Sequence, residues 1–420
     1  FYDIDQPWTQ PWCTNNLSLY FLVGMPKNNQ QEGSFIRSVL DKSQREGLEV
    51  EFEVISNQDL VEAASALAQP QGLVVTLLKS TLGFKEISAV ARTIASHNFT
   101  ISKIKRLSTL QHQMTSEAGK NEGPTRCAFH AMQNGEPTTA VSNVPNVSAV
   151  EFLVEPPQDA HIDPAVASEF RTKLRSSLME LRLDLECDLA LQRETLLRRS
   201  KRLVVLDMDS TLIQQEVIDE LARRAGKYDE VAAVTEEAMR GELDFNESLS
   251  MRCAHLKGLP ESVFEEVYKE SIVLTPGADR FIKVLKELGF NTAIISGGFQ
   301  QIADRVKNDL GMDYAFANVL EVKNGHLTGE VVGAVVNRQR KRDLVESLCQ
   351  MSGLTREQVV AVGDGANDLD MLLHAGLGIA FNAKPLVQQQ ANHAINSANR
   401  LDTVLYMMGI SDSDVSALDR

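Results

Sequence analysis

Short apolar runs alternate with longer amphipathic stretches from Lys201 onward. This alternation predicts parallel strands joined by crossover helices. Positions 203–206 and 359–362 are apolar at consecutive residues, as strands buried on both faces require. We therefore predict a Rossmann-like α/β domain, a doubly wound parallel sheet between two layers of helices, over about residues 200–410. Its predicted strands are the runs RLVVLD, NTAIIS, QVVAVGD and GLGIAF.

Two segments interrupt this rhythm. A helical, strongly charged stretch at about 216–275 is too long for an ordinary connection in a compact domain, so we expect an inserted helical cap. The sequence VLEVKNGHLTGEVV at 319–332 places Asn324 and Gly325 between two alternating strands. That pair is typical of a two-residue hairpin turn, so we expect a flap there.

The first two hundred residues have a different pattern. Residues 71–195 predict the order βαββαβ, which is the ferredoxin-like arrangement, with helices at about 84–96 and 166–181. The stretch 112–146 is rich in Ser, Thr, Asn, Gly and Pro, and predicts a long mobile loop between the second and third strands. Residues 1–70 predict a further α/β segment, which could be a partial copy of the same unit.

Composition narrows the functional class. A chain of 420 residues with 43% hydrophobic content can bury more than one core. The net charge of −15 disfavours a nucleic-acid partner and favours a small-molecule substrate. The five cysteines have no CxxC spacing, and no run of eighteen apolar residues occurs. We therefore expect no disulfide framework, zinc site or membrane partner, and a cytoplasmic location.

Acidic residues follow two of the predicted strands. Asp207 and Asp209 come directly after LVVL, and Asp364 begins the run DGAND after QVVAVG. Ligands of open α/β sheets bind outside the carboxyl ends of the strands, so both groups are expected at one edge. A carboxylate can attack phosphorus if a cation offsets the charge repulsion, and oxygen ligands suit Mg²⁺. Either run could alternatively be a plain turn or helix cap.

Two weaker features complete the predicted site. Ser296 and Gly297 follow NTAII and precede a helix, which is the form of a phosphate cradle. Lys341, in RQRKRDL, could neutralise phosphoryl oxygens in the transition state. The residues alone leave Arg340 and Arg342 open as alternatives.

These elements, in this order, resemble the haloacid dehalogenase superfamily over about the last half of the chain. The runs DMDSTLIQQEVIDELA, EAMRGELDFNESLSMR, IISGGF and VAVGDGANDLDML are similar to those of its phosphoserine phosphatases. The resemblance implies that Asp207 is the nucleophile and Asp209 the general acid and base. It implies a Mg²⁺ ion bound by Asp207, Asp364 and the backbone carbonyl of Asp209. It implies that Ser296, Gly297 and Lys341 hold the phosphate.

The same resemblance implies a reaction and the residues that read its substrate. The reaction would be hydrolysis of O-phospho-L-serine to L-serine and phosphate through an aspartyl-phosphate intermediate, the last step of serine biosynthesis. Glu216 would bind the ammonium and Arg252 the carboxylate of the substrate. The resemblance implies roles for four further residues. Asn367 would contact the substrate or its phosphate, and Asp368 would orient Lys341 or a metal-bound water. Met239 and Phe245 would form an apolar wall over the substrate and exclude water.

Two alternatives stay open at this point. The same superfamily includes phosphatases and phosphotransferases that act on other small phosphomonoesters, such as phosphohomoserine. An alternative of another class is an amino-acid sensor, because residues 71–195 resemble the amino-acid-binding regulatory domains called ACT domains. That resemblance implies an amino-acid effector, although the loop STLGFKE departs from a clearer glycine-rich turn. We also expect a homodimer.

Overall fold

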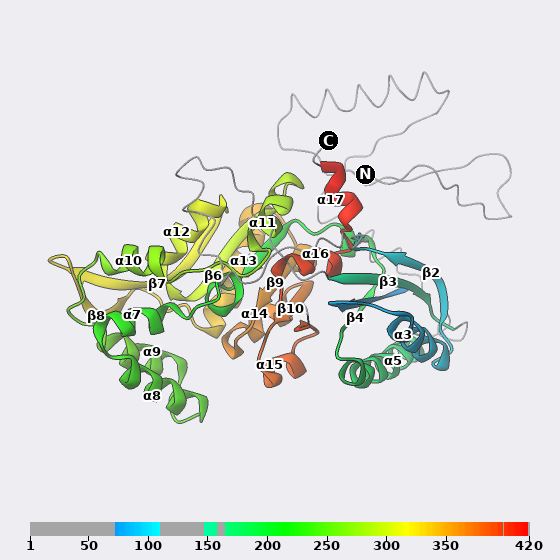
Figure 1. Cartoon of the computed structure of the whole chain (residues 1–420), viewed down its shortest axis with the longest axis horizontal. Coiled ribbons are helices and arrows are strands. Elements are labelled where there is room, and N and C mark those ends of the chain that lie inside the picture. Colours follow the sequence, from blue (N-terminus) through cyan, green and yellow to red (C-terminus); the bar gives the residue numbers. More distant parts are fainter. Residues whose placement is uncertain (1–71, 110–146, 158–163, 398, 419–420) are drawn as a thin grey trace, which may run out of the picture. The chain divides into compact units, whose positions relative to one another are not determined.

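The computed structural model describes residues 72–109, 147–157, 164–397 and 399–418. All of these belong to one compact unit of the chain. The described residues form two sheets, of seven and of four strands (Figure 1). The predicted segment 1–70 and the predicted loop 112–146 lie outside the described residues. None of the described helices is both long and apolar enough to cross a bilayer.

The seven-stranded sheet has the order β11-β10-β9-β5-β6-β7-β8. Every pair in it is parallel except β7 with β8. Strand β5 therefore lies in the middle, with β9 on one side and β6 on the other. The strands are β5 (Leu203–Leu206), β6 (Asn291–Phe299), β7 (Tyr314–Lys323), β8 (His326–Val332), β9 (Val359–Gly363), β10 (Leu377–Phe381) and β11 (His393–Ile395).

Helices cover both faces of this sheet, as the apolar runs predicted. Val204 and Leu206 of β5 face one buried cluster, and Leu203 and Val205 face another. Alternate residues of a strand point to opposite faces, so β5 must be apolar throughout. The helices of this domain outside the cap are α11 (Ala278–Glu287), α12 (Gln300–Leu310), α13 (Arg338–Ser352), α14 (Leu369–His374), α15 (Pro385–Gln390), α16 (Val404–Met407) and α17 (Asp412–Leu418), with the short turns η3 (Arg356–Gln358), η4 (Ala366–Asp368) and η5 (Leu401–Thr403).

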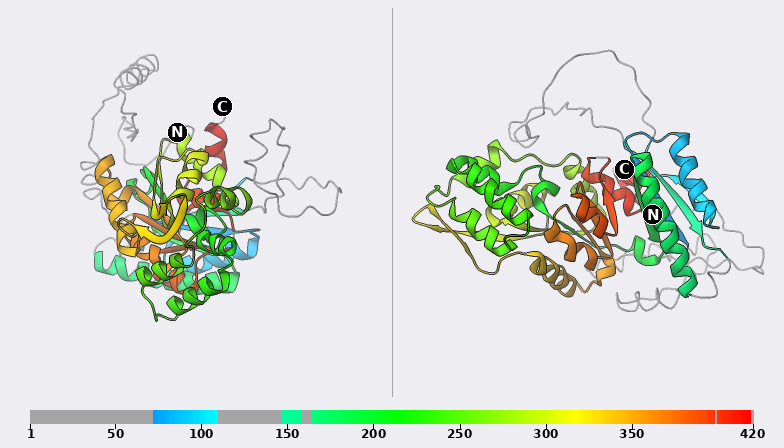
Figure 2. Two further views of the ribbon diagram at one scale, coloured as in Figure 1. Left: turned by 90° about the vertical axis from the view of Figure 1, so that its left-hand side faces the viewer. Right: turned by 90° about the horizontal axis from the view of Figure 1, so that it is seen from below.

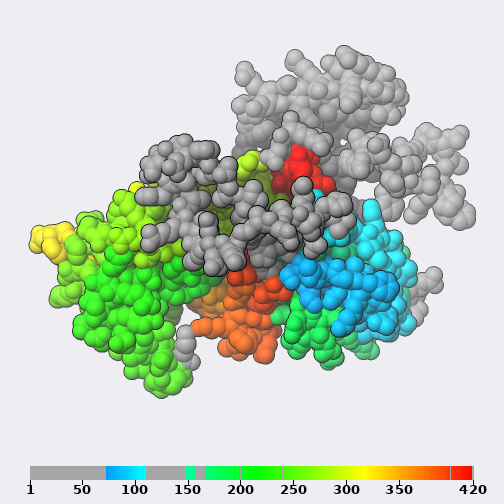
Figure 3. Space-filling view, viewed as in Figure 1, coloured from blue at the N-terminus to red at the C-terminus, as the bar shows by residue number. Residues whose placement is uncertain are grey.

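The predicted cap is a group of four helices inserted after β5: α7 (Val217–Ala225), α8 (Tyr228–Met239), α9 (Phe245–Ala254) and α10 (Val263–Glu270). In Figure 2 its green helices lie beside the yellow strands, and Figure 3 shows the green surface that they form. The two chain segments that connect it to the sheet are bonded to each other. Ile213 pairs with Leu274, and Thr275 N donates to Leu212 O. These bonds join the two connections at the base of the cap.

The predicted hairpin is present, and the cap is bonded to it. Strands β7 and β8 are antiparallel, with Asn324 and Gly325 both at positive φ in the turn. The segment that joins α9 to α10 runs along β8: Gly258 N donates to Leu327 O, and Leu327 N donates to Leu259 O. The flap and the cap are therefore linked by backbone hydrogen bonds.

The four-stranded sheet has the order β2-β3-β1-β4, and all its pairs are antiparallel. A buried cluster that includes Val75, Ile94, Phe152 and Leu174 joins the sheet to two helices. The elements are β1 (Leu73–Lys79), α3 (Phe84–Ser96), β2 (Thr100–Arg106), β3 (Ser148–Glu155), α5 (Pro164–Leu185) and β4 (Asp188–Arg193), followed by the short helix α6 (Leu196–Arg199).

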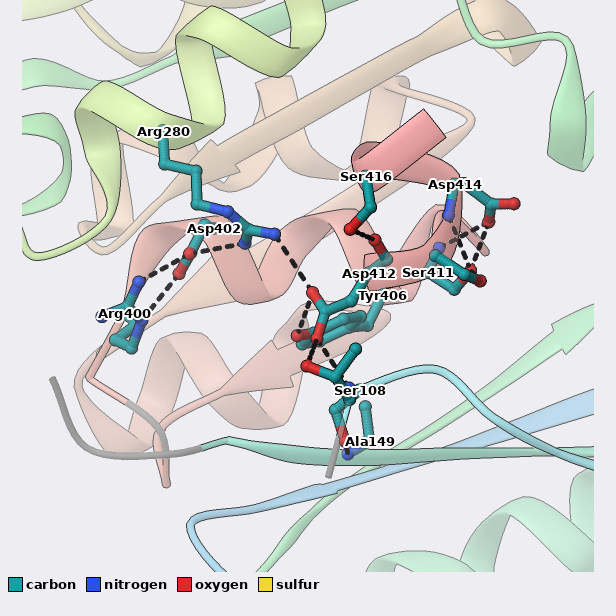
Figure 4. A network of polar contacts seen from close by, with 12 residues as sticks. Ser108, Ala149, Arg280, Arg400, Asp402, Tyr406, Ser411, Asp412, Asp414 and Ser416 are labelled. Atoms are coloured by element: carbon teal, nitrogen blue, oxygen red, sulfur yellow. Dashed lines mark hydrogen bonds and ion pairs between the residues drawn. The ribbon is translucent and has the colours of Figure 1, made fainter. Parts of the chain in front are cut away.

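Polar contacts tie this sheet to the rest of the unit. Arg198 of α6 and Glu151 of β3 form an ion pair at 2.6 Å, and both side chains are almost fully buried. At the start of α17, Asp412 accepts hydrogen bonds from Arg280 and Tyr406 (Figure 4), and from Thr109 N. Removing one partner of a buried charged pair leaves the other charge uncompensated, so the Glu151–Arg198 pair resists separation of α6 from this sheet.

Candidate active site

The loop that follows β5 carries the first two predicted carboxylates. Asp207 is 5% exposed, and its Oδ1 accepts a hydrogen bond from Met208 N at 2.8 Å. The chain then turns sharply, with Ser210 at a φ of 55°. The Oδ1 of Asp209 is buried without a hydrogen-bond partner. A buried, unpaired carboxylate oxygen is costly, and such groups mark sites that receive a ligand or a proton.

The second acidic group lies beside the first, as the strand order requires. Leu206 of β5 pairs with Val362 of β9, so the residues that follow both strands emerge at one edge of the sheet. Asp364 Oδ1 accepts a hydrogen bond from Thr211 Oγ1 at 2.9 Å. Carboxylate oxygens of Asp207, Asp364 and Asp368 lie within 4.8 Å of one another.

Lys341 of α13 is the basic residue that faces this cluster. Its side chain is fully buried, and its Nζ lies 2.9 Å from Asp207 Oδ1 and 2.6 Å from Asp368 Oδ1. Arg340 is exposed, and Arg342 pairs with the neighbouring Asp343. Of the three basic residues that the sequence left open, Lys341 is therefore the one in contact with Asp207.

Burial and crowding dominate the electrostatics of the site. Burial, followed by the charge of Asp368, raises the pKa of Asp207 well above its usual range. Burial, followed by Glu216, does the same to the pKa of Asp209. The pKa of Asp364 rises to about 7, through burial and then Asp368. Burial lowers the pKa of Lys341, but Asp207 and Asp368 outweigh it and raise that pKa overall. The single ammonium of Lys341 cannot balance the aspartate carboxylates of this cluster, so the site carries an excess of negative charge.

The predicted phosphate cradle is a close-packed turn at the end of β6. Ser296 is buried, and its Oγ accepts a hydrogen bond from Gly298 N at 2.8 Å. A Cβ at Gly298 would lie 2.8 Å from Asp209 Oδ2. A Cβ at Gly297 would lie 3.1 Å from the Phe245 ring and 3.4 Å from Asn367 Nδ2. A larger residue at position 298 would therefore force a neighbouring group to shift, and one at position 297 would be tightly packed against Phe245.

The remaining predicted residues come mainly from the cap. Phe245, in the first turn of α9, lies against the Gly297 turn. Glu216 precedes α7 and accepts a hydrogen bond from Ser210 Oγ at 2.8 Å. Arg252, further along α9, is half-buried and lowers the pKa of Asp219 in the first turn of α7, against the larger effect of burial. Met239 ends α8, and its side chain lies outside the described part of the structure.

Three residues at the site were missed by the sequence reasoning. Thr211 donates to Asp364, and Thr275 Oγ1 donates to Thr211 O at 2.7 Å, which connects the acidic loop to the base of the cap. Asn318 of β7 is 1% exposed and donates to Gly297 O at 2.7 Å. Asn318 could have been noticed in the sequence, because it is a polar residue on the otherwise apolar side of the strand AFANVLEV.

Comparison with known proteins gives concordant matches. Residues 201–376 match the family model of haloacid dehalogenase-like hydrolases. The chain is 47% identical over 274 residues to a phosphoserine phosphatase of Streptomyces coelicolor, covering 65% of this chain and 66% of that protein. It is 46% identical over 215 residues to the phosphoserine phosphatase of Lactococcus lactis, covering 51% of this chain and 99% of that protein.

A solved structure extends the likeness beyond the matched region. The crystal structure of a HAD family hydrolase from Salmonella enterica is 28% identical, with a TM-score of 0.60, and covers 80% of this chain and 98% of its own. The chain spans just under two thirds of the Streptomyces coelicolor protein but nearly all of the Lactococcus lactis protein.

Proposed function

Because the chain belongs to the phosphoserine phosphatase family of haloacid dehalogenase-like hydrolases, we propose that it hydrolyses O-phospho-L-serine to L-serine and inorganic phosphate. The observation that carries the proposal is the contact of Lys341 Nζ with Asp207 Oδ1, beside Asp364. A fixed cation next to a buried carboxylate at the carboxyl edge of the sheet suits in-line attack on a phosphoryl group.

The acidic residues fit a magnesium ion. Asp207 and Asp364 offer hard oxygen ligands, and the buried Oδ1 of Asp209 has no hydrogen-bond partner. Burial, and then the charge of Asp368, raise the pKa of Asp364. We propose that Asp207, Asp364 and the backbone carbonyl of Asp209 hold Mg²⁺. When bound, the ion offsets the repulsion between the phosphate and the attacking carboxylate. Asp368 is held instead by Lys341.

In the proposed reaction, Asp207 attacks phosphorus in line while the bond from phosphorus to the serine oxygen breaks. Asp209 gives a proton to the departing oxygen, and its raised pKa keeps that proton available. Asp209 then takes a proton from water as the water attacks the aspartyl-phosphate and releases Asp207. Lys341, oriented by Asp368, balances charge on the phosphoryl oxygens throughout, while Ser296 and Gly297 hold them.

Recognition of serine is assigned to the cap. Glu216 binds the substrate ammonium, Arg252 pairs with its carboxylate, and Asn367 contacts the phosphate. Phe245 closes over the Gly297 turn, with Met239 as the second proposed apolar residue, and excludes water during transfer.

The substitution Arg252→Ala tests this assignment together with the reaction. We expect kcat/KM for phosphoserine to fall about 100-fold, because a carboxylate loses its charge-assisted partner, while an aryl phosphate loses less than about threefold. Phosphate release is measured for phosphoserine, phosphothreonine, phosphohomoserine and the aryl phosphate, with magnesium and with a chelator. Arg240→Ala, on an exposed residue of the same cap, is the control.

Equal losses on phosphoserine and the aryl phosphate would show that Arg252 does not read the substrate. A wild-type preference for phosphohomoserine would favour the alternative substrate class. Release that persists undiminished after chelation would contradict the magnesium site.

We also propose that residues 71–195 form an ACT-type regulatory domain that binds an amino-acid effector, and that the chain acts as a homodimer. The βαββαβ order of the described elements supports this assignment. The domain 200–410 with its cap at 216–275 is proposed as the catalytic part. A cytoplasmic location remains a prediction from the cysteine pattern.

Titration of L-serine against the full-length enzyme tests the regulatory proposal. Serine formed at the active site competes with phosphoserine, whereas an effector at a second site also lowers kcat, so we expect mixed inhibition. Initial rates at several substrate concentrations give the pattern, and sedimentation gives the oligomeric state. Purely competitive inhibition of a monomer would contradict the proposal. The full chain is used because Leu78 and Ala149 are buried in one cluster with residues after Lys201.

A further inference from the structure

The phosphate-binding turn leaves the ladder between β6 and β7. Ile295 pairs with Phe316 and the next pair is Phe299 with Asn318, so four steps along β6 match two along β7. Ser296, Gly297 and Gly298 occupy the additional length. Their backbone groups lose the hydrogen-bond partners that a regular parallel strand would supply.

One buried side chain replaces a missing partner. Asn318 Nδ2 donates to Gly297 O at 2.7 Å, and Asn318 Oδ1 accepts from Val336 N at 2.8 Å. A carbonyl can only accept and a backbone N–H can only donate, so these two partners fix the orientation of the amide. The side chain is 1% exposed, and water does not compete for either bond.

The second partner leads directly to Lys341. Val336 is followed by Asn337, which caps α13 by accepting a hydrogen bond from Arg340 N. Lys341 lies in the first turn of that helix and contacts Asp207 and Asp368. The Asn318 amide is thus bonded on one side to the turn that cradles phosphate and on the other to the segment that starts the lysine helix.

We propose that Asn318 is a positioning residue for phosphoryl transfer, which sets the distance between the Ser296–Gly298 turn and Lys341. This inference rests on the proposed phosphatase function. Neither partner of Asn318 lies in the serine-reading part of the cap, so its effect is on the phosphoryl group, whatever alcohol is attached to it. Displacing a positioning group by about 1 Å can cost roughly a hundredfold in rate.

The variant Asn318→Leu keeps the approximate shape of the side chain and removes both hydrogen bonds. We expect kcat to fall about 100-fold on phosphoserine and on an aryl phosphate alike. The affinity for orthophosphate, measured by calorimetry with magnesium present, should fall at least about tenfold. This measurement requires no turnover, and the amount of bound orthophosphate is calculated per folded protein molecule.

A matched control separates positioning from loss of stability. Thr292, the second residue of β6, is also buried, and its Oγ1 donates to Asp313 Oδ2 at 2.9 Å. It lies at the end of β6 away from the site. Thr292→Val removes a comparable buried hydrogen bond and should change kcat and orthophosphate affinity by less than about threefold, since its partners are remote from the phosphate. Thermal unfolding of both variants shows their cost in stability.

Equal losses for Asn318→Leu and Thr292→Val at similar stability would overturn the proposal, and so would unchanged orthophosphate affinity in the former. If Asn318→Leu does not fold, Asn318→Ser, whose hydroxyl can serve one of the two partners at most, is judged by the same criteria. If the wild-type enzyme cleaves the aryl phosphate but not phosphoserine, the proposed function is wrong. The role of Asn318 can still be tested in that case, because the comparison of the two variants on the aryl phosphate and on orthophosphate does not depend on phosphoserine.

Discussion

Asp207→Asn is expected to lower phosphate release from phosphoserine by at least about 10⁴-fold, because removal of a covalent nucleophile costs this much or more. An amide has the same shape as the carboxylate but does not attack phosphorus. The fold should persist, since Met208 N can still donate to the Asn oxygen and Lys341 keeps Asp368 as its partner.

Stability gives a second readout for the same variant. Burial and the charges of Asp368 and Asp364 raise the pKa of Asp207, so a neutral amide at this position relieves an unfavourable charge. We expect a melting temperature equal to or above that of the wild type. Asp304→Asn, the same change in a half-exposed residue of α12, should leave activity unaltered. Substantial turnover by Asp207→Asn would rule out Asp207 as the nucleophile.

Lys341→Met is expected to lower both activity and stability. The ammonium is fully buried between Asp207 and Asp368, so its removal leaves two buried carboxylates without their countercharge. Breaking a buried ion pair from one side costs about 3–5 kcal/mol. Loss of the charge beside the phosphoryl group should lower kcat by about 10³-fold, as for other fixed cations and oxyanion donors. Denaturant unfolding and initial rates measure the two effects.

The two effects of Lys341 can be separated by a second change. Lys341→Met combined with Asp368→Leu removes both the cation and its nearest anion, so stability should recover in part while activity stays low. Lys201→Met is the control, because Lys201 is also buried but donates to Glu357 O, away from the acidic cluster. If the double variant regained activity together with stability, Lys341 would have only a structural role.

Much of the site follows from patterns that are local in the sequence. Asp207 and Asp364 were predictable because each follows a short apolar strand, and parallel strands end at one edge. The choice of Lys341 over Arg342 does not follow from the helical period. Lys341 has buried Leu344 and Leu348 at spacings of three and seven residues, but Arg342 has buried Val345 and Cys349 at the same spacings.

The supporting contacts could not be predicted in the same way. Asn318 meets Gly297 and Val336 only because β6 contains additional residues opposite β7, and no sequence period reveals such a register shift. The bond from Thr211 to Asp364 joins residues that are 153 positions apart. Such contacts depend on the assembled sheet, whereas the strand ends depend on runs of a few residues.

The bonds between cap and hairpin affect how substrate preference can be re-engineered in this chain. A cap transplanted from another family member as residues 213–275 alone would lose the fitted contacts with β8, where Gly329 leaves only 3.1 Å between an added Cβ and Ala254 Cα. The donor segment would also have to supply partners for Gly325 O and Leu327, which now bond Glu261, Gly258 and Leu259. A chimera that exchanges residues 213–275 together with 319–332 transfers the cap and the hairpin as one unit and keeps the backbone hydrogen bonds between them. Asn318 then still comes from the recipient chain.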